Sequence, residues 1–331
     1  DETTTALSQT GRNLLYKLMR KMADEGGSVM FISHDLDEMM EHCDAVTVLR
    51  DGNIIGSLDK EEFDGNKMKE MMVGREVSGN YYRNDNDSYE DEITLKAHCI
   101  TTRKDLLCFN LELHKGEVLG IGGLSECGMH TVGKALFGYE KILDGKVTVG
   151  AKQTVVKNPE TAIANGIAYT SKDRDHESLG LAGSIRDNIA STGYYFNRIF
   201  GPIISFGKEK KFVQNQIDTL ELKCASQYHS VNTLSGGNKQ KVVFGKWIGS
   251  EADVLILDCP TRGIDIGVKA SMYQLIYKMK KQGKSIILIS EELPELIGMS
   301  DRILIMKDGK IVHEAMRSEN PTEHDLINYM I

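Results

Sequence analysis

The sequence predicts an α/β protein in which one complete folding unit is preceded by the C-terminal part of a second copy. Residues 1–54 align without a gap on residues 258–311, at a constant offset of 257 residues. In both copies, short apolar stretches typical of buried strands alternate with amphipathic helical patterns. A glycine-rich turn at 122–128 joins one such strand to a helix. These observations favour a strand and helix alternation around a buried sheet.

The chain divides into three regions by composition. The polar and acidic stretch SGNYYRNDNDSYEDE at 78–92 has no periodicity, and we interpret it as a linker between a partial unit at 1–77 and a complete unit at 93–331. In the first region, the pattern predicts helices at 11–23 and 36–42 and strands at 28–33 and 45–49. In the last region, it predicts strands at 93–101, 106–113, 118–121, 166–170, 254–257, 285–290 and 302–307, a helix at 131–138, a polar loop at 171–177, a helix-rich stretch at 185–222 and a helix at 269–281.

Composition excludes several classes of protein. The 331 residues are 40% hydrophobic and 27% charged, which is ordinary for a globular chain, and the net charge of −8 argues against a dedicated nucleic-acid binder. No stretch approaches the roughly 18 consecutive apolar residues that span a bilayer, and no secretory leader precedes the first strand, so a membrane role would be peripheral. The cysteines lack metal-binding spacing and are expected to be reduced thiols in a cytosolic compartment: Cys43, Cys99, Cys108, Cys127, Cys224 and Cys259.

The strongest local motif is Leu234-Ser-Gly-Gly-Asn-Lys-Gln240, which is followed by a helical pattern and the apolar strand 254–257 ending in Asp258. A hydroxyl and two glycines at a helix start leave backbone N–H groups free to meet a phosphate, and the helix dipole favours its negative charge. The motif alone would also suit a simple glycine turn. The aspartate that follows the apolar strand favours nucleotide binding.

This motif order resembles the signature and Walker B elements of ATP-binding cassette (ABC) proteins. More closely, 234–243, 260–265 and 298–304 resemble the second cassette of the fused two-cassette ATPases that energise bacterial import of ribose, galactose and xylose. The resemblance covers the whole chain. It implies a P-loop NTPase cassette with a RecA-like core, an antiparallel β subdomain and a helical subdomain, and it implies ATP and Mg²⁺ as cofactors.

The resemblance also implies catalytic roles in the first copy. Asp1 ends a Walker B strand and helps to hold Mg²⁺, Glu2 polarises the attacking water, and His34 contacts the γ-phosphate. For His34 alone, an ordinary structural histidine is the simpler interpretation, but its place in the repeat favours the functional role.

The second copy departs from this chemistry. Cys259 stands opposite Glu2, and Glu291 stands opposite His34. A thiol is mostly neutral at pH 7 and is a poor substitute for a carboxylate base. We therefore expect the second site to lack both its water-activating acid and its γ-phosphate histidine, although Asp258 keeps the position of a Mg²⁺ ligand.

The phosphate loop of the second copy is also altered. Where GxxxxGK[ST] is expected, the chain has its two glycines, Gly123 and Gly128, but Met129 replaces the lysine and His130 replaces the metal-binding hydroxyl, with Thr131 one place later. Glu126 adds a carboxylate that repels a phosphate about 6 Å away by roughly 3 kcal/mol at an effective dielectric near 20. We interpret this loop as a strand-to-helix turn that does not bind ATP tightly.

In the family that the chain resembles, each nucleotide lies between one cassette's phosphate loop and the other cassette's signature. The second cassette would then serve the first site through its signature residues, which are Ser235, Gly236, Gly237, Asn238, Lys239 and Gln240. Asp265 takes the D-loop position, and Lys172, Asp173 and Arg174 lie in the Q-loop region that faces the membrane subunits, although the family usually has an acidic residue at position 172. The first phosphate loop and first signature are expected upstream of Asp1, so this chain alone would not be a competent ATPase.

The resemblance implies an ATP-binding subunit that sits peripherally at the cytoplasmic face of the membrane. It would dock on separate permease subunits, act indirectly with a substrate-binding protein, and energise import of a simple sugar. A nucleoside or other small-solute importer of the same family, and a non-catalytic truncated remnant, remain open. A soluble two-cassette protein acting on ribosomes or DNA is a third alternative, but it predicts a basic linker, and 78–92 is acidic.

Overall fold

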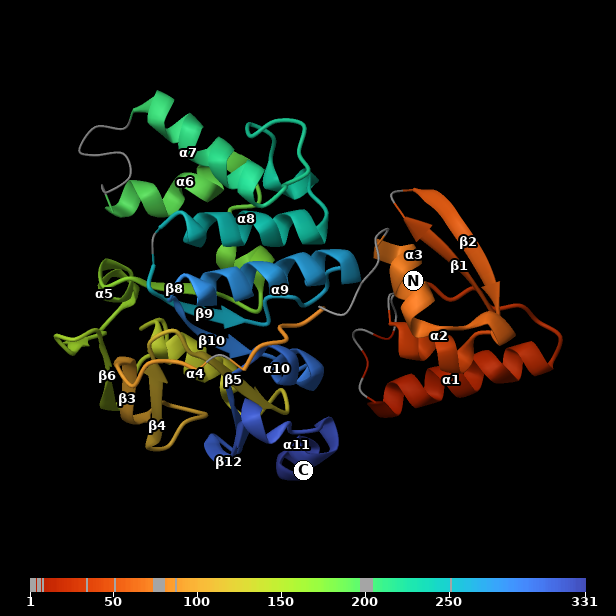
Figure 1. The fold of residues 1–331 in the computed structure, drawn as a ribbon, viewed down its shortest axis with the longest axis horizontal. Helices are drawn as coiled ribbons and strands as arrows, with labels where there is room; N and C mark the ends of the chain where they lie inside the picture. Colours follow the sequence, from red (N-terminus) through yellow and green to blue (C-terminus); the bar gives the residue numbers. More distant parts are fainter. Residues whose placement is uncertain are drawn as a thin grey trace. The chain divides into compact units, whose positions relative to one another are not determined.

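The computed structural model describes residues 4, 7, 9–33, 35–50, 52–73, 81–86, 88–196, 205–250 and 252–331. The chain forms two units, one of residues 1–81 with 263–271 and one of residues 82–262 with 272–331 (Figure 1). Among the described residues, no helix has both the length and the apolarity that crossing a bilayer requires.

The smaller unit combines helices with a two-stranded antiparallel sheet. Its elements before residue 82 are α1 (Gln9–Asp24), α2 (Leu36–His42), β1 (Ala45–Arg50), β2 (Asn53–Asp59), η2 (Lys60–Glu62) and α3 (Gly65–Val73). The side chain of Asp35 caps α2 by accepting hydrogen bonds from the backbone N–H groups of Asp37 and Glu38. The core of the unit consists of buried apolar side chains, which are Leu36, Met39, Val46, Val48, Leu58 and Met68. The expected helices and the strand at 45–49 are thus confirmed.

The strand expected at 28–33 is wrong. These residues form neither helix nor strand, and Met30 is 91% exposed. In the second copy, the matching strand β10 (Ser285–Ile289) is hydrogen-bonded on both sides by parallel neighbours. In the described part of the smaller unit, β1 and β2 pair with each other, and no strand is placed to pair with 28–33. An apolar segment without a neighbouring ladder has no partners for its backbone groups and does not form a strand.

The larger unit is built on a six-stranded sheet of order β12-β11-β5-β10-β9-β8. Its strands are β5 (Val118–Gly123), β8 (Ile167–Thr170), β9 (Val254–Asp258), β10, β11 (Arg302–Lys307) and β12 (Lys310–Met316). The strands from β8 to β11 in this order are parallel, and β12 is antiparallel to β11. Every residue of β5, β9 and β10 is buried, as expected for parallel strands covered on both faces.

A second, four-stranded sheet of order β4-β3-β6-β7 is antiparallel. It consists of β3 (Ile93–Thr101), β4 (Phe109–His114), β6 (Asp144–Val149) and β7 (Thr154–Val155), and it confirms the hairpin expected at 93–113. The remaining elements are α4 (Met129–Leu136), α5 (Pro159–Ala164), the single π-helical turn η3 (Arg174–Ser178), α6 (Ile185–Phe196), α7 (Phe206–Thr219), η4 (Val231–Thr233), α8 (Gly236–Ile248), α9 (Ile266–Lys281), α10 (Leu293–Met299), η5 (Arg317–Glu319) and α11 (Glu323–Met330). In Figure 1, α6, α7 and α8 lie together at the top of this unit, and β3, β4 and β6 lie at its lower left. The six-stranded core thus carries a separate group of helices and a separate antiparallel sheet.

The internal repeat is visible in the secondary structure of the two copies. The pairs α1 and α9, α2 and α10, β1 and β11, β2 and β12, and η2 and η5 have bounds that differ by the same 257 residues. Even the irregularity between Val48 and Leu49 in the first hairpin recurs between Ile305 and Met306 in the second. The offset found in the sequence therefore extends beyond residue 54, to the end of η2 at Glu62.

Part of the stretch expected as a linker packs within the larger unit. The Arg83 side chain is fully buried, donates to the Asp301 carboxylate and lies 3.2 Å from Asp85 Oδ1. Arg317 donates to the backbone oxygens of Arg83 and Asp85, at 2.6 and 2.9 Å. Residues 83–85 are thus held by charged side chains, while the domain boundaries at 77/78 and 92/93 stay predictions.

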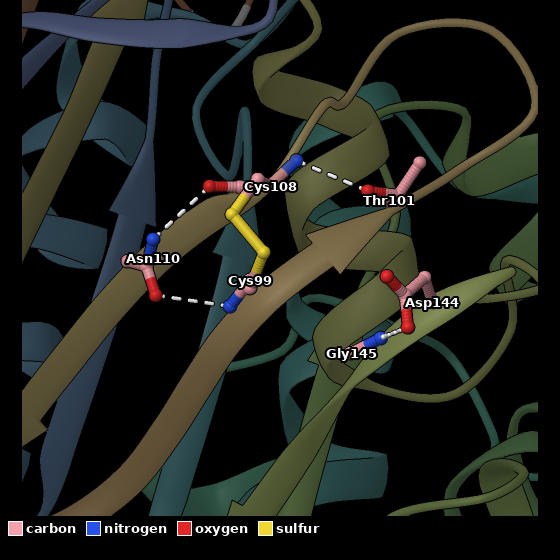
Figure 2. The surroundings of a disulfide bond; sticks show 6 residues. All are labelled: Cys99, Thr101, Cys108, Asn110, Asp144 and Gly145. Carbon is pink, nitrogen blue, oxygen red and sulfur yellow. Dashed lines mark hydrogen bonds between the residues drawn. A yellow bond between two sulfur atoms is a disulfide. The ribbon is translucent and has the colours of Figure 1, made fainter.

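The expectation that all six cysteines are reduced thiols is wrong for two of them. Cys99 and Cys108 form a disulfide between β3 and the approach to β4 (Figure 2). The side chain of Asn110 links both, since its Oδ1 accepts from the Cys99 N–H and its Nδ2 donates to the Cys108 carbonyl. The hairpin register, which spacing along the chain does not reveal, brings the two together. Cys43, Cys127, Cys224 and Cys259 are free.

Candidate functional site

The candidate site of the larger unit lies where the carboxyl ends of its parallel strands meet. In the ladder, Ile121 of β5 and Asp258 of β9 both pair with Ile289 of β10, and Leu257 pairs with Thr170 of β8. The loops that leave these strands therefore open at one edge of the sheet, the usual place for ligands in such sheets. Those loops carry most of the residues that the sequence singled out.

The glycine-rich turn keeps its shape at this edge. Gly128 has φ of +94° at the start of α4, a left-handed conformation that favours glycine. Met129 is completely buried, so the position expected for a phosphate-binding lysine faces the core. Thr131 donates its hydroxyl to Asp105, a partner that the sequence reasoning missed. Glu126 is exposed on the turn. The turn is therefore formed, but its side chains offer no cation to a phosphate.

His130 connects the turn to the end of β9. Its Nδ1 lies 2.7 Å from Oδ1 of Asp258, which is completely buried, and its Nε2 lies 3.1 Å from Nζ of Lys172. Lys172 in turn donates to Oε1 of Glu291 at 2.6 Å, and Ser125 donates to the same oxygen at 2.9 Å. The structure thus brings together four of the predicted site residues and adds Ser125, which sequence reasoning missed.

The protonation of this cluster follows from its contacts. Burial lowers the pKa of His130, but the hydrogen bonds of its ring to Asp258 and Glu291 outweigh this effect, and the net shift is upward. The hydrogen bond with His130, together with those from Lys172 and Ser125, holds the pKa of Glu291 well below its usual range. Burial, aided by the nearby Asp258 charge, raises the pKa of the Cys259 thiol. A thiol that stays protonated at neutral pH cannot act as the base for water attack.

The donors around Asp258 do not fit Mg²⁺ held with ATP. Mg²⁺ takes oxygen ligands and keeps near-ideal octahedral geometry. Here the atoms nearest to the Asp258 carboxylate include an imidazole nitrogen, and the hydroxyl of Thr131 is engaged by Asp105. The role of Asp258 as a Mg²⁺ ligand stays a prediction that this donor set does not favour.

The signature residues lie at the start of α8. Ser235 is the N-cap, and its hydroxyl accepts from the backbone N–H and the side-chain amide of Asn238. Lys239 donates to Asp175 at 3.1 Å, and Gln240 is buried. Ser235 itself is exposed, Gly236 is half-buried and Gly237 is buried. Within the described residues, these six positions form no hydrogen bond or ion pair with the His130 cluster, so the signature is a separate feature.

The other predicted site residues divide into two groups. Asp1, Glu2 and His34 lie outside the described residues. Asp265 accepts a hydrogen bond from the backbone of Val268 and so caps α9. Asp173 accepts from the backbone N–H of His176, and Arg174 donates to the backbone oxygen of Arg262. These three have clear structural roles, and their proposed functional roles stay predictions.

The two copies share one buried hydrogen-bond network that sequence reasoning did not single out. Glu295 accepts from the hydroxyls of Thr261 and Ser290. At the equivalent positions, Glu38 accepts from Thr4 and Ser33, each at 3.0 Å. The glutamates and the serines are matched at the offset of 257, so the repeat could have identified this network from the sequence. The shared network supports the alignment of the two copies.

A groove of about 380 Å³ lies on the larger unit. Its lining includes Phe137 and Tyr139 after α4, Tyr169 of β8, and Lys246 and Trp247 of α8. Burial lowers the pKa of Lys246, and the indole N–H of Trp247 is buried without a hydrogen-bond partner in the described part of the chain. An aromatic groove of this kind can accept an apolar segment of a partner.

Residues 106–262 match the family described as ABC transporter. This match covers slightly less than half of the chain. It is 36% identical over 311 residues to the ribose import ATP-binding protein RbsA of Bacillus cereus, covering 94% of this chain and 62% of that protein. It is 36% identical over 334 residues to the protein of the same name from Clostridium tetani, covering 100% of this chain and 65% of that protein. The chain thus spans slightly less than two thirds of the length of these relatives.

Solved structures agree with the cassette fold. A dimeric ATP-binding cassette in a post-hydrolysis state, bound to ADP and Pi, superposes with a TM-score of 0.60 at 20% identity, covering 67% of this chain and 98% of that chain. A cassette of an ABC transporter in its ADP conformation superposes with a TM-score of 0.57 at 20% identity, covering 72% of this chain and 98% of that chain. The expected fold class, a P-loop ABC cassette, is confirmed.

Proposed function

We propose that this chain is the C-terminal part of an ATP-binding subunit that energises import of a simple sugar through separate permease subunits. The observation that carries the proposal is its identity of about a third to ribose import ATP-binding proteins along nearly the whole chain. The subunit would lie peripherally at the cytoplasmic face of the membrane and would meet a substrate-binding protein only through the permease. The simple sugar is inferred from the relatives' names, which specify ribose.

The proposed division of labour between the copies is asymmetric. Asp1 would help to hold Mg²⁺, Glu2 would polarise water, and His34 would contact the γ-phosphate of ATP. The second cassette would contribute Ser235 and the free backbone N–H groups at the start of α8, where the helix dipole favours an anion. The buried Met129 and the protonated thiol of Cys259 support a second site that does not hydrolyse ATP.

The groove beside Trp247 supports a docking place for the permease. It lies against the end of β8 and the segment that follows, which includes Glu177 and Ser178. We propose that a cytoplasmic segment of the permease fills this groove and packs against its aromatic side chains. Tyr139 lines the groove and is 60% exposed, so Tyr139→Ala should weaken association with permease-containing membranes while leaving the unfolding midpoint of the chain nearly unchanged.

Substitution of Ser235 tests the function directly. In the full-length protein assembled with its permease, Ser235→Ala should lower ATP hydrolysis and sugar uptake about a hundredfold, the scale of losing one preorganised group that stabilises developing charge. Its structural cost as a helix cap is only about 1 kcal/mol.

Ser230→Ala is the matched control for this experiment. Ser230 also caps a short helix, η4, but lies outside the signature. Its loss should produce a similar small destabilisation and leave hydrolysis intact. Equal ATPase activity in the two variants would contradict the proposed role of the signature, and uptake of no sugar by the assembled wild-type transporter would contradict the proposed substrate class.

A further inference from the structure

We propose that His130, Asp258 and Cys259 form a zinc site at the carboxyl edge of the six-stranded sheet. One ligand atom from each residue can be chosen so that all three lie within 4.8 Å of one another. Asp258 and Cys259 are consecutive at the end of β9, and His130 is in the first turn of α4. The three donors therefore come from two rigid elements of the fold. Small side-chain movements bring atoms at this separation to bonding distance from one ion.

The donor types favour zinc over magnesium. Imidazole nitrogen, thiolate sulfur and carboxylate oxygen are the three kinds of ligand that Zn²⁺ takes in proteins, at about 2.0 to 2.3 Å. Mg²⁺ prefers oxygen throughout. Three protein ligands leave a fourth tetrahedral position, which a water molecule can occupy. His130 and Cys259, which make the site unsuitable for Mg²⁺ with ATP, thus form with Asp258 a ligand set for a softer ion.

The surroundings of His130 include a carboxylate that can orient the ring when Nδ1 binds zinc. Nδ1 of His130 faces the Asp258 carboxylate, while Nε2 lies 3.1 Å from Nζ of Lys172 and 3.5 Å from Oε1 of Glu291, which can accept once Nε2 carries the proton. A zinc-bound imidazole usually donates its other ring N–H to a carboxylate, which fixes the orientation of the ring. The hydroxyl of Tyr169 lies 3.4 Å from Oδ2 of Asp258 and can orient the second oxygen of that ligand.

The negative charge of Asp258 favours a bound cation. Asp258 is completely buried, and within the described residues neither lysine nor arginine forms an ion pair with it. Lys172 lies near Nε2 of His130, but its charge is compensated by Glu291 at 2.6 Å. Zn²⁺ would neutralise the Asp258 carboxylate and a Cys259 thiolate. His130 is partly exposed, which gives the ion a way in.

Zinc titration of the whole chain tests the site without reference to ATP hydrolysis. After treatment with a chelator, the chain should bind about one equivalent of Zn²⁺ in competition with a chromophoric chelator, and Co²⁺ should give the absorption of a four-coordinate ion with a thiolate ligand. Cys259→Ser should weaken Zn²⁺ binding at least about a hundredfold and abolish the thiolate band. Cys224→Ser removes a half-buried free thiol elsewhere and should change neither.

Two further measurements keep the proposal falsifiable if Cys259→Ser folds poorly. Glu291→Gln keeps the shape of the positioning residue and should weaken Zn²⁺ binding about 10- to 100-fold. Zn²⁺ should also raise the thermal midpoint of the wild-type chain and not that of His130→Gln. Absence of Zn²⁺ binding by the wild type would overturn the proposal. So would one-equivalent binding that is unchanged in Cys259→Ser, because the ion would then lie elsewhere.

Discussion

Replacing Arg83 by methionine tests whether the stretch after residue 81 is part of the larger unit or a free linker. The guanidinium is fully buried between Asp301 and Asp85. Methionine fills similar volume without charge, so the change removes the interaction more than the packing. A linker that merely connects two units would tolerate this substitution, whereas a buried ion pair would not.

The magnitude follows from what remains around the two carboxylates. Asp301 still accepts from the backbone N–H of Val118 at 2.7 Å and faces Lys280 at 3.2 Å, and Asp85 still faces Lys281 at 3.3 Å. Removing one partner of a fully buried pair costs about 3 to 5 kcal/mol, and an exposed pair contributes about 0 to 1 kcal/mol. Because each carboxylate keeps a cation, we expect Arg83→Met to lower the free energy of unfolding by about 2 to 3 kcal/mol.

The assay uses the single tryptophan of the chain, Trp247, which belongs to the larger unit. Urea unfolding followed by its fluorescence reports the unit that Arg83 is expected to stabilise. With a slope of about 3 kcal/mol per molar urea, the midpoint should fall by somewhat less than about 1 M. Arg83→Lys keeps the charge but not the planar guanidinium that reaches two carboxylates, so its urea midpoint should lie between those of the wild type and Arg83→Met. An unchanged midpoint in Arg83→Met would refute the reasoning.

Two other predictions concern the stability of the same unit. Gly145→Ala should lower the free energy of unfolding by more than about 2 kcal/mol, because Gly145 has φ of +84° and a Cβ there would overlap the backbone oxygens of His98 and Cys99. The control Gly150→Ala has φ of +69° but open space around the Cβ, so it should cost about 1 kcal/mol. Equal midpoints of the two variants in urea would contradict the steric argument. Burial alone would raise the pKa of Glu177, but the hydrogen bond from Lys134 and the positive charge of Lys134 lower it, and the net shift of the pKa is downward. A carboxyl whose pKa is lowered by folding stabilises the folded state at pH values above its unfolded pKa, which is near 4.5. This stabilisation is lost as the pH falls through the folded pKa. The stability difference between the wild type and Glu177→Gln should therefore be about 0.5 to 1 kcal/mol near neutral pH and should shrink in acid, and a difference independent of pH would exclude this ion pair as its cause.

Much of the fold could be predicted because buried strands and helices have recognisable apolar patterns in the sequence. The strands at 254–257 and 285–290 are continuous apolar runs, and they form the centre of the parallel sheet. The helix at 36–42 begins after an aspartate that caps it, and its predicted bounds agree with α2. The prediction of a strand at 28–33 was wrong because of its surroundings. Its sequence is as apolar as its counterpart, but strand formation depends on neighbours that a local pattern does not specify.

The candidate site could be predicted only in part. Sequence comparison of the two copies identified Cys259 and Glu291 as departures, and motif spacing identified His130. Their mutual distances depend on strand order, which the linear sequence does not contain. The pairing of Lys172 with Glu291 was missed for that reason, since these residues are far apart in the chain and follow different strands.

The comparison of the two copies separates the residues that hold the fold from those that perform chemistry. Glu38 and Glu295 keep the same hydroxyl partners at equivalent positions, so this buried network is present in both copies. Two positions predicted to act on the nucleotide differ, since Cys259 and Glu291 stand where the first copy has Glu2 and His34. A copy that had lost its fold would lose the network as well. The second copy has instead kept a rigid frame and changed the donors at its sheet edge, which is the condition under which a new ligand can replace the old one.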